Sequence, residues 1–161
     1  MAWTTPGTAV AGNVLTAAQW NSDVRDNSLS LARGIVARAT ITTSQNTTSS
    51  LATDITGATV TWTAESNRLY KISFTTYMTK ATNAGNAELL ITDASNNVKQ
   101  IRDTYFYGVT TFQHGFIYVV ETGLSGSVTR KVRFLTTTSS LTVEGASTYP
   151  SQLIVEDCGL A

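Results

Sequence analysis

The feature that most constrains the fold is an alternation of apolar and polar residues with a period of two, which begins at Ile35. Successive side chains of a β-strand point to opposite faces, so this alternation predicts strands with one buried side. The clearest example covers residues 69–79, where polar side chains separate four large apolar ones. These apolar residues are Tyr70, Ile72, Phe74 and Met78.

Similar short segments recur along the chain, and clusters of Ser, Asn, Asp and Gly separate them. We expect turns at residues 65–67 and 93–97, a loop at 42–50 and a loop at 80–86. No second helix and no internal repeat interrupts the series, so the sequence predicts an antiparallel β-sandwich of the jelly-roll type. The expected strands cover 35–41, 60–62, 69–79, 88–92, 98–106, 112–120, 128–134, 141–144 and 152–156.

Residues 16–34 depart from this pattern and are expected to form a single helix. Thr16 and Gln19 have the spacing of a capping box, in which each residue satisfies a backbone N–H group at the helix start. Gly34 is typical of the left-handed residue that ends a helix. Between these ends runs a narrow seam of the coiled-coil type: Trp20, Val24, Asn27 and Leu31.

Two uses of this seam stay open. It can pack once against the chain's own β-domain, or it can meet copies of itself, with Asn27 fixing the register. Two heptads are too short to hold an oligomer alone, since isolated helices below ~15 residues are marginal in water. An oligomer would therefore be held mainly by the β-domain.

Residues 1–15 show no regular period and are interrupted by Pro6 and two glycines. A tryptophan in such a segment, Trp3, gains a few kcal/mol (roughly 2–3) when it is buried. We expect Trp3 to dock into another protein rather than to fold back. The segment has no basic start and no apolar run, so we do not expect a secretion signal.

Charge and rare residue types argue against several functions. Eleven basic residues balance eleven acidic ones without runs of either sign, so neither nucleic acid nor a membrane is the expected partner. His114 is the single histidine and Cys158 the single cysteine. A histidine metal cluster and an internal disulfide are therefore impossible within one chain, and no metal or cofactor is expected. We expect both side chains to be buried, with His114 on an inward face of a long strand. The residues that share this face are Phe112, His114, Phe116, Tyr118 and Val120.

Candidate residues for chemistry are few. Paired carboxylates could serve a polysaccharide hydrolase, but the acids fall mainly at strand ends and turns, so this is the third-ranked hypothesis. The aromatic cluster Tyr105, Phe106 and Tyr107 could stack on a sugar, although cross-strand packing is the commoner use of such residues. A carbohydrate-binding module that recognises a surface glycan is the second hypothesis. The acids considered for the hydrolase hypothesis are Glu65, Glu88, Asp93, Asp103, Glu121 and Glu144.

Both ends of the chain carry short motifs. The opening has Trp3-Thr-Thr-Pro6, Ala11-Gly12, Leu15-Thr-Ala17, Trp20-Asn21 and Val24-Arg-Asp-Asn27, and the end has Val155-Glu-Asp-Cys-Gly159. Together these motifs resemble those of small virion proteins of tailed bacteriophages, whose closing strand has the pattern V-E-D-x-G, with Cys158 where an aliphatic residue is more usual. In that setting the carbohydrate-binding module of the second hypothesis would lie at a tail tip and recognise a host surface glycan. The segment 69–74 and the last strand look weakly like the trimeric jelly rolls of the C1q and tumour-necrosis-factor type.

The resemblance implies a structural part of a virion and brings no catalytic residues. We therefore expect residues 1–34 to be a docking arm and helix that grip a capsid or tail protein, and residues 35–161 to be a projecting β-domain. A homotrimer is expected, since its β-domains can bury aromatics such as Phe112, Phe116 and Tyr118 against each other. The expected location is the virion, assembled in the host bacterial cytoplasm, with capsid decoration or head fibre slightly favoured over a minor tail protein.

Overall fold

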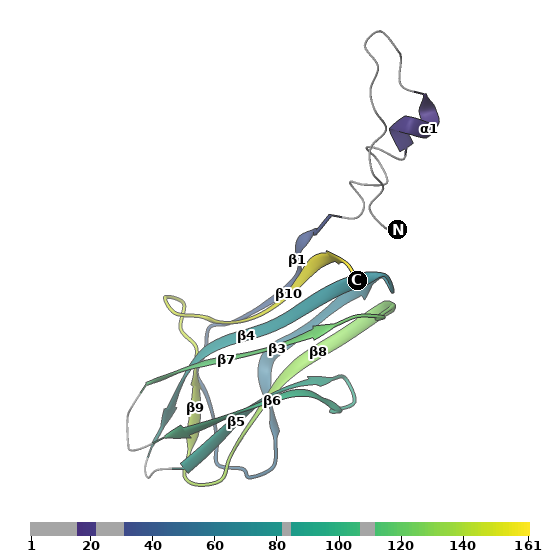
Figure 1. Ribbon diagram of the computed structural model, residues 1–161. Helices are drawn as coiled ribbons and strands as arrows, with labels where there is room; N and C mark the ends of the chain where they lie inside the picture. Colours follow the sequence, from purple (N-terminus) through teal and green to yellow (C-terminus); the bar gives the residue numbers. More distant parts are fainter. Residues whose placement is uncertain (1–15, 22–30, 82–84, 107–111) are drawn as a thin grey trace.

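The computed structural model describes residues 16–21, 31–81, 85–106 and 112–161. Its strands form two antiparallel sheets that pack face to face (Figure 1), so the predicted antiparallel, jelly-roll-like β-sandwich is confirmed. Beside the short helix α1 (Ala17–Trp20), the strands are β1 (Gly34–Ile41), β2 (Gln45–Thr47), β3 (Thr53–Ala64), β4 (Arg68–Lys80), β5 (Gly85–Asp93), β6 (Val98–Phe106), β7 (Gln113–Glu121), β8 (Gly126–Thr136), β9 (Leu141–Glu144) and β10 (Ser151–Leu160).

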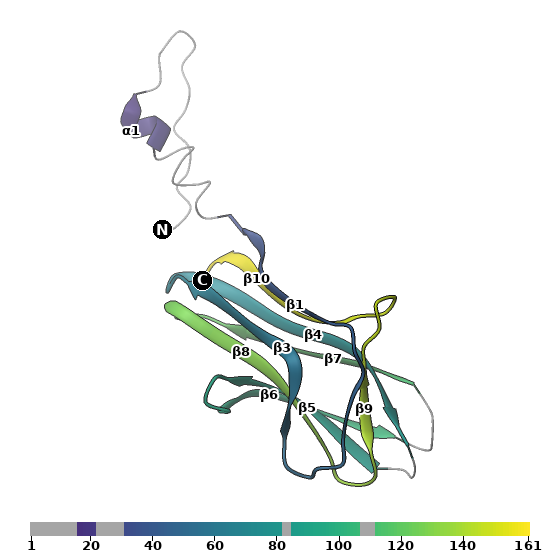
Figure 2. The ribbon, with the colours of Figure 1, turned by 180° about the vertical axis from the view of Figure 1, so that it is seen from behind.

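The long strand β4 organises the larger sheet, whose order is β1-β10-β4-β9-β2 with β7 on the other edge of β4. Residues 68–75 of β4 pair with β10, and residues 77–80 pair with β9 along the same edge. Residues 70–78 pair with β7 on the opposite edge. The second sheet has the order β3-β8-β5-β6, and the two layers are seen from behind in Figure 2.

The core lies between the sheets and follows the predicted alternation. Every apolar residue singled out in residues 69–79 is at most 1% exposed. Trp62 of β3 packs on Tyr70 with ring centroids 5.7 Å apart, and the hydroxyl of Tyr70 accepts a hydrogen bond from the backbone N–H of Glu65 in the next turn. The predicted turn at residues 65–67 is thereby attached to the core. Strand β2, inside the expected loop at 42–50, is an element that the sequence reading missed.

The expected helix is confirmed at its start and wrong at its end. Thr16 and Gln19 form the predicted capping box, with the Gln19 backbone N–H 3.2 Å from the Thr16 hydroxyl. Leu31 to Arg33 are not helical, and Gly34, although its φ is +73°, begins β1 instead of ending a helix. Residues 22–30 lie outside the described residues. None of the residues of α1 is buried.

Two expectations of burial are corrected. The face of β7 that carries His114 points outward, and Gly115, Ile117 and Val119 point toward the core instead. Cys158 is exposed, because the alternate residues of β10, such as Asp157, take the inward positions. Both strands carry apolar side chains on both faces, so hydrophobicity alone assigned the faces wrongly.

In the part of the chain that the structure describes, no helix has the length and apolar character needed to cross a membrane.

Candidate functional site

Large apolar side chains gather on the outward face of the β4–β7 pair. Cross-strand partners place Tyr77 opposite His114, Thr75 opposite Phe116 and Ser73 opposite Tyr118. Since partners in register project from the same face, small hydroxyl residues on β4 leave the rings of β7 uncovered. We call the following set the aromatic face: Tyr77, Phe112, His114, Phe116, Tyr118 and Val120.

The rings of the aromatic face contact each other. Tyr77 and His114 meet edge to face with centroids 5.5 Å apart, and Phe116 and Tyr118 lie 5.7 Å apart at 31°. Tyr118 is 50% exposed and Phe112 69% exposed. A contiguous exposed apolar patch of this kind marks an interaction surface more often than a solvent-facing one.

A pocket of about 370 Å³ opens at the β9 end of this face. It is lined by Tyr77 and Phe112, by Glu144 to Ala146 at the end of β9, and by Tyr149 in the loop before β10. The Glu144 carboxylate accepts hydrogen bonds of 2.8 Å from the hydroxyls of Ser44 and Thr79. These two bonds fix the direction of the carboxylate within the pocket wall.

A buried ion pair lies at the opposite end of the sandwich, where β1 begins. Arg68 Nε and Nη2 donate to the two carboxylate oxygens of Asp157 at 2.8 and 2.7 Å. Both side chains are 1% exposed. Arg68 Nη2 also donates to the backbone carbonyl of Leu31 at 2.6 Å, which attaches the segment before β1 to the β-domain.

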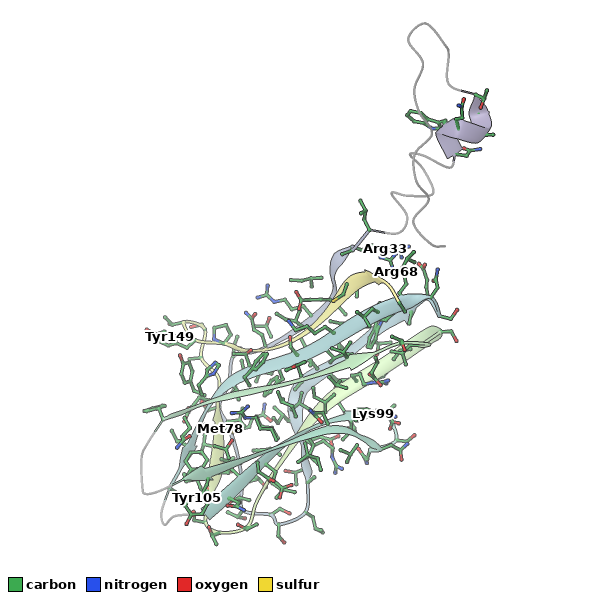
Figure 3. The ribbon with its side chains drawn as sticks, in the orientation of Figure 1. Arg33, Arg68, Met78, Lys99, Tyr105 and Tyr149 are labelled. Atoms are coloured by element: carbon green, nitrogen blue, oxygen red, sulfur yellow. The ribbon has the colours of Figure 1, made fainter. Side chains whose placement is uncertain are left out.

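A second arginine completes this junction. Arg33 lies next to Arg68 (Figure 3), forms an ion pair with Glu65, and has its Nε 3.9 Å from Asp157. Burial by itself raises the pKa of Asp157, but the hydrogen bonds from Arg68 and from the Gly159 N–H outweigh it and hold the pKa below its ordinary value. The Asp157 carboxylate is thus ionised and fully engaged in the interior.

The residues proposed from the sequence for anchoring are exposed where they are described. Trp20 is 54% and Leu31 56% exposed, so neither side chain is buried against the β-domain. Trp3, Pro6, Val24 and Asn27 lie outside the described residues.

The expected sugar-binding cluster is corrected at one residue. Phe106, at the end of β6, is fully buried in the core, so its ring is not available to a ligand. Tyr105 is 48% exposed on the neighbouring position (Figure 3), and Tyr107 lies outside the described residues. Tyr105 is therefore the one ring of this cluster that the described residues present to solvent.

Two of the acids considered for a hydrolase come together. Glu88 of β5 and Asp103 of β6 are cross-strand partners. Burial is the largest cause that raises the pKa of Glu88, and the charge and hydrogen bond of Asp103 raise it further. The pair lies along the edge strand β6, where Asp103 is exposed. Of the other acids, Glu65 and Glu121 form ion pairs with Arg33 and Arg130, and Asp93 accepts hydrogen bonds in the predicted turn from Ser95 and Asn97.

Two stacked antiparallel sheets with this strand order define the class of jelly-roll β-sandwiches. Among solved structures, the chain is similar to that of Eiger TNF from S. frugiperda, with a TM-score of 0.52 at 10% identity, covering 80% of this chain and 96% of that one. This likeness shows the fold, and it agrees with the expected resemblance to tumour-necrosis-factor jelly rolls.

Two further similarities have TM-scores below 0.5. The VP2 subviral particle of infectious bursal disease virus has a TM-score of 0.42 at 12% identity, with 80% of this chain and 38% of that chain covered. The enzymatically active domain of tailspike protein 4 of bacteriophage CBA120 has a TM-score of 0.27 at 12% identity, with 80% and 19% covered. At these values the similarities support no functional argument. No protein-family model matches the chain, and no curated protein matches it in sequence.

Proposed function

We propose that the chain is a structural, non-enzymatic component of a tailed-phage particle. In this proposal residues 1–34 dock onto a capsid or tail protein, and residues 35–161 project from the particle as a trimeric β-domain. A capsid decoration or head-fibre position is favoured over a minor tail position, because residues 35–161 form one small β-domain, which suits a protein that decorates a particle surface.

The observation that carries this proposal is where residues 31–34, which follow the opening motifs in the sequence, meet the end of the chain. Gly34 pairs with Asp157 across β1 and β10, and Arg68 joins Asp157 to the carbonyl of Leu31. The V-E-D-x-G ending, which resembles that of phage virion proteins, thus forms one junction with the segment that leads from the expected docking arm into the β-domain. A buried ion pair there fixes the direction in which the chain leaves the β-domain, which is what a projecting appendage requires.

The aromatic face supplies the surface for the proposed trimer. Tyr77, Phe112 and Tyr118 are exposed on the single chain and Phe116 is half-buried. Stable self-association needs an apolar centre of this kind, with aromatic residues enriched. Phe112, Phe116 and Tyr118, the residues expected to be buried between protomers, all belong to this face. The neighbouring pair Lys71 and Glu156, 3.1 Å apart, gives the face a polar border.

The docking role is tested by incorporation into particles. Cells that assemble the phage are supplied with the chain lacking residues 2–15 in place of the full chain, and purified particles are assayed for it by mass spectrometry. We expect the truncated chain to fold and to oligomerise but to be absent from particles. A full-length Tyr105→Ala chain, altered at an exposed ring outside the arm, serves as the control and is expected to incorporate. Normal incorporation of the truncated chain would show that residues 2–15 are not the anchor.

A further inference from the structure

We propose that the pocket at the β9 end of the aromatic face binds an organic cation of the quaternary ammonium type. This inference does not depend on the virion proposal, since it rests on the lining of the pocket alone. The ligand class follows from three features: how the pocket is built, which groups line it, and which groups are missing from that lining.

The pocket is built on paired strands, so its geometry is fixed before a ligand arrives. Tyr77 of β4 and Glu144 of β9 are direct cross-strand partners, which places the ring and the carboxylate side by side on the outward face. Gly145 closes the floor against the backbone of Thr43, where an added Cβ would come within 2.9 Å of main-chain atoms. The Ser44 hydroxyl bonds to both the Glu144 carboxylate and the Gly145 N–H.

The lining consists of aromatic rings around one carboxylate. Tyr77, Phe112 and Tyr149 are 47%, 69% and 70% exposed and present their rings to the opening. Tyr149 comes from the loop that joins β9 to β10 (Figure 3). Ring faces attract cations through their quadrupoles, and a ring of aromatic residues is the usual receptor for a methylated ammonium group.

Charge complementarity favours a cation over a neutral ligand. Among the described residues Glu144 makes no ion pair; its recorded side-chain partners are the neutral hydroxyls of Ser44 and Thr79. Among the described residues that line the pocket, none is a lysine, arginine or histidine. A monocation seated against the rings would therefore be matched by the Glu144 carboxylate without displacing another positive group.

The same lining disfavours a sugar. A hexose carries several hydroxyl groups that need partners when they are desolvated. The side chains that line the pocket offer two phenol hydroxyls and a carboxylate that already accepts two hydrogen bonds. A trimethylammonium group has no N–H donors and no acceptors, so it leaves no polar group unsatisfied in such a pocket.

The test compares choline with its neutral isostere 3,3-dimethyl-1-butanol, in which carbon replaces the charged nitrogen. Both are titrated by NMR into the full chain in the oligomeric state in which it is purified, since Tyr77 and Phe112 are shared with the proposed self-interface. We expect choline to bind with a millimolar constant and at least about tenfold more tightly than the isostere. Equal binding of the two compounds, or no choline binding up to about 50 mM, would overturn the proposal.

Variants locate the site and distinguish charge from shape. Tyr149→Ala and Glu144→Gln should each weaken choline binding at least about fivefold, while Glu144→Gln should leave the isostere unchanged. Tyr105→Ala, which removes a similarly exposed ring from the other sheet, is the matched control and should bind choline as the unaltered chain does. Circular dichroism establishes that each variant is folded. If choline bound equally to all variants, or if a hexose saturated the pocket where choline did not, the assignment would be wrong.

Discussion

Arg68 and Asp157 form a bidentate ion pair in the interior, with donor–acceptor distances of 2.8 and 2.7 Å and 1% of each side chain exposed. The residues lie 89 positions apart in the sequence, on β4 and β10. Removal of one partner would leave the other charge buried and unpaired, so the stability of the fold requires both residues together. It also ties the last strand to the start of the β-domain through Leu31.

Replacement of one member of this pair is expected to destabilise the protein strongly. Arg68→Met should lower the free energy of unfolding by about 3–5 kcal/mol, measured by urea denaturation at a fixed protein concentration. The double variant Arg68→Met with Asp157→Leu should recover most of that loss, since it removes both charges. A loss below about 1 kcal/mol in the single variant would contradict the buried pair.

The turn at residues 93–97 is expected to make the stability of the protein fall at acidic pH. Hydrogen bonds from the Asn97 side chain and from backbone N–H groups lower the pKa of Asp93 from 3.8 to about 2. A carboxyl whose folded pKa is lowered contributes stability above its unfolded pKa and loses it as the pH falls through the folded pKa. The melting temperature of the unaltered chain should therefore fall between about pH 4 and pH 2.

The Asp93→Asn variant isolates this effect. It should be less stable than the unaltered chain at pH 7 and should lose stability less steeply below pH 4. Part of the acid sensitivity should remain, since the pKa values of Asp54 and Asp157 are also lowered, by ion pairs and hydrogen bonds. Identical pH profiles of the two proteins would count against the turn as described.

Gly115 is expected to tolerate no side chain. It faces the core on β7, where an added Cβ would lie 2.8 Å from Thr76 Cγ2 and 3.0 Å from Leu89 Cδ1. Gly115→Ala should cost about 1–3 kcal/mol of stability through overpacking, as measured by chemical denaturation. Ser127→Ala, at an exposed strand position, should change stability by less than about 0.5 kcal/mol. If Gly115→Ala left the free energy of unfolding unchanged, the residues around Gly115 could not be packed as closely as described.

Asn27 is predicted from the helical seam to fix the register of an oligomer. Asn27→Leu should raise the melting temperature and broaden the distribution of oligomers, because an apolar seam is more stable and less specific. Native mass spectrometry and a thermal scan measure both quantities. A single species of lower stability would argue against a self-paired seam.

The strands were predictable because their signal is local. Alternation in residues 69–79 indicated the buried side of β4, and the turn at 93–97 is closed by hydrogen bonds to Asp93 within five residues. The sheet order, the missed strand β2 and the attachment of Leu31 to the β-domain depend on partners far along the chain. Arg68, which donates a hydrogen bond to the Leu31 carbonyl, is 37 residues away from it.

The functional surfaces were predicted only in part, for a related reason. The rings of residues 112–120 were recognised as one face, but β7 is apolar on both sides, and the small residues that mark the inward side, such as Gly115, gave no hydrophobic signal. The pocket could not be foreseen, because it joins Tyr77, Phe112, Glu144 and Tyr149 from separate elements. A buried acid in the V-E-D-x-G ending was a missed signal, since an aspartate at an inward strand position requires a partner.

The outward aromatic face is expected to hold the oligomer together. The double variant Phe116→Ser with Tyr118→Ser should dissociate into folded monomers, because it removes two contacting rings from the proposed self-interface. Tyr105→Ser, at 48% exposure against 50% for Tyr118, is the matched control on the other sheet and should leave the oligomer intact. The measurement is analytical ultracentrifugation together with circular dichroism.

The mass of the purified full-length protein in solution tests the proposed assembly most directly. The chain has a mass of 17.2 kDa, so a trimer should sediment as a species of about 52 kDa and should persist on dilution to micromolar concentration. A folded species of 17.2 kDa under the same conditions would contradict the proposal that the exposed aromatic face joins three copies of this chain.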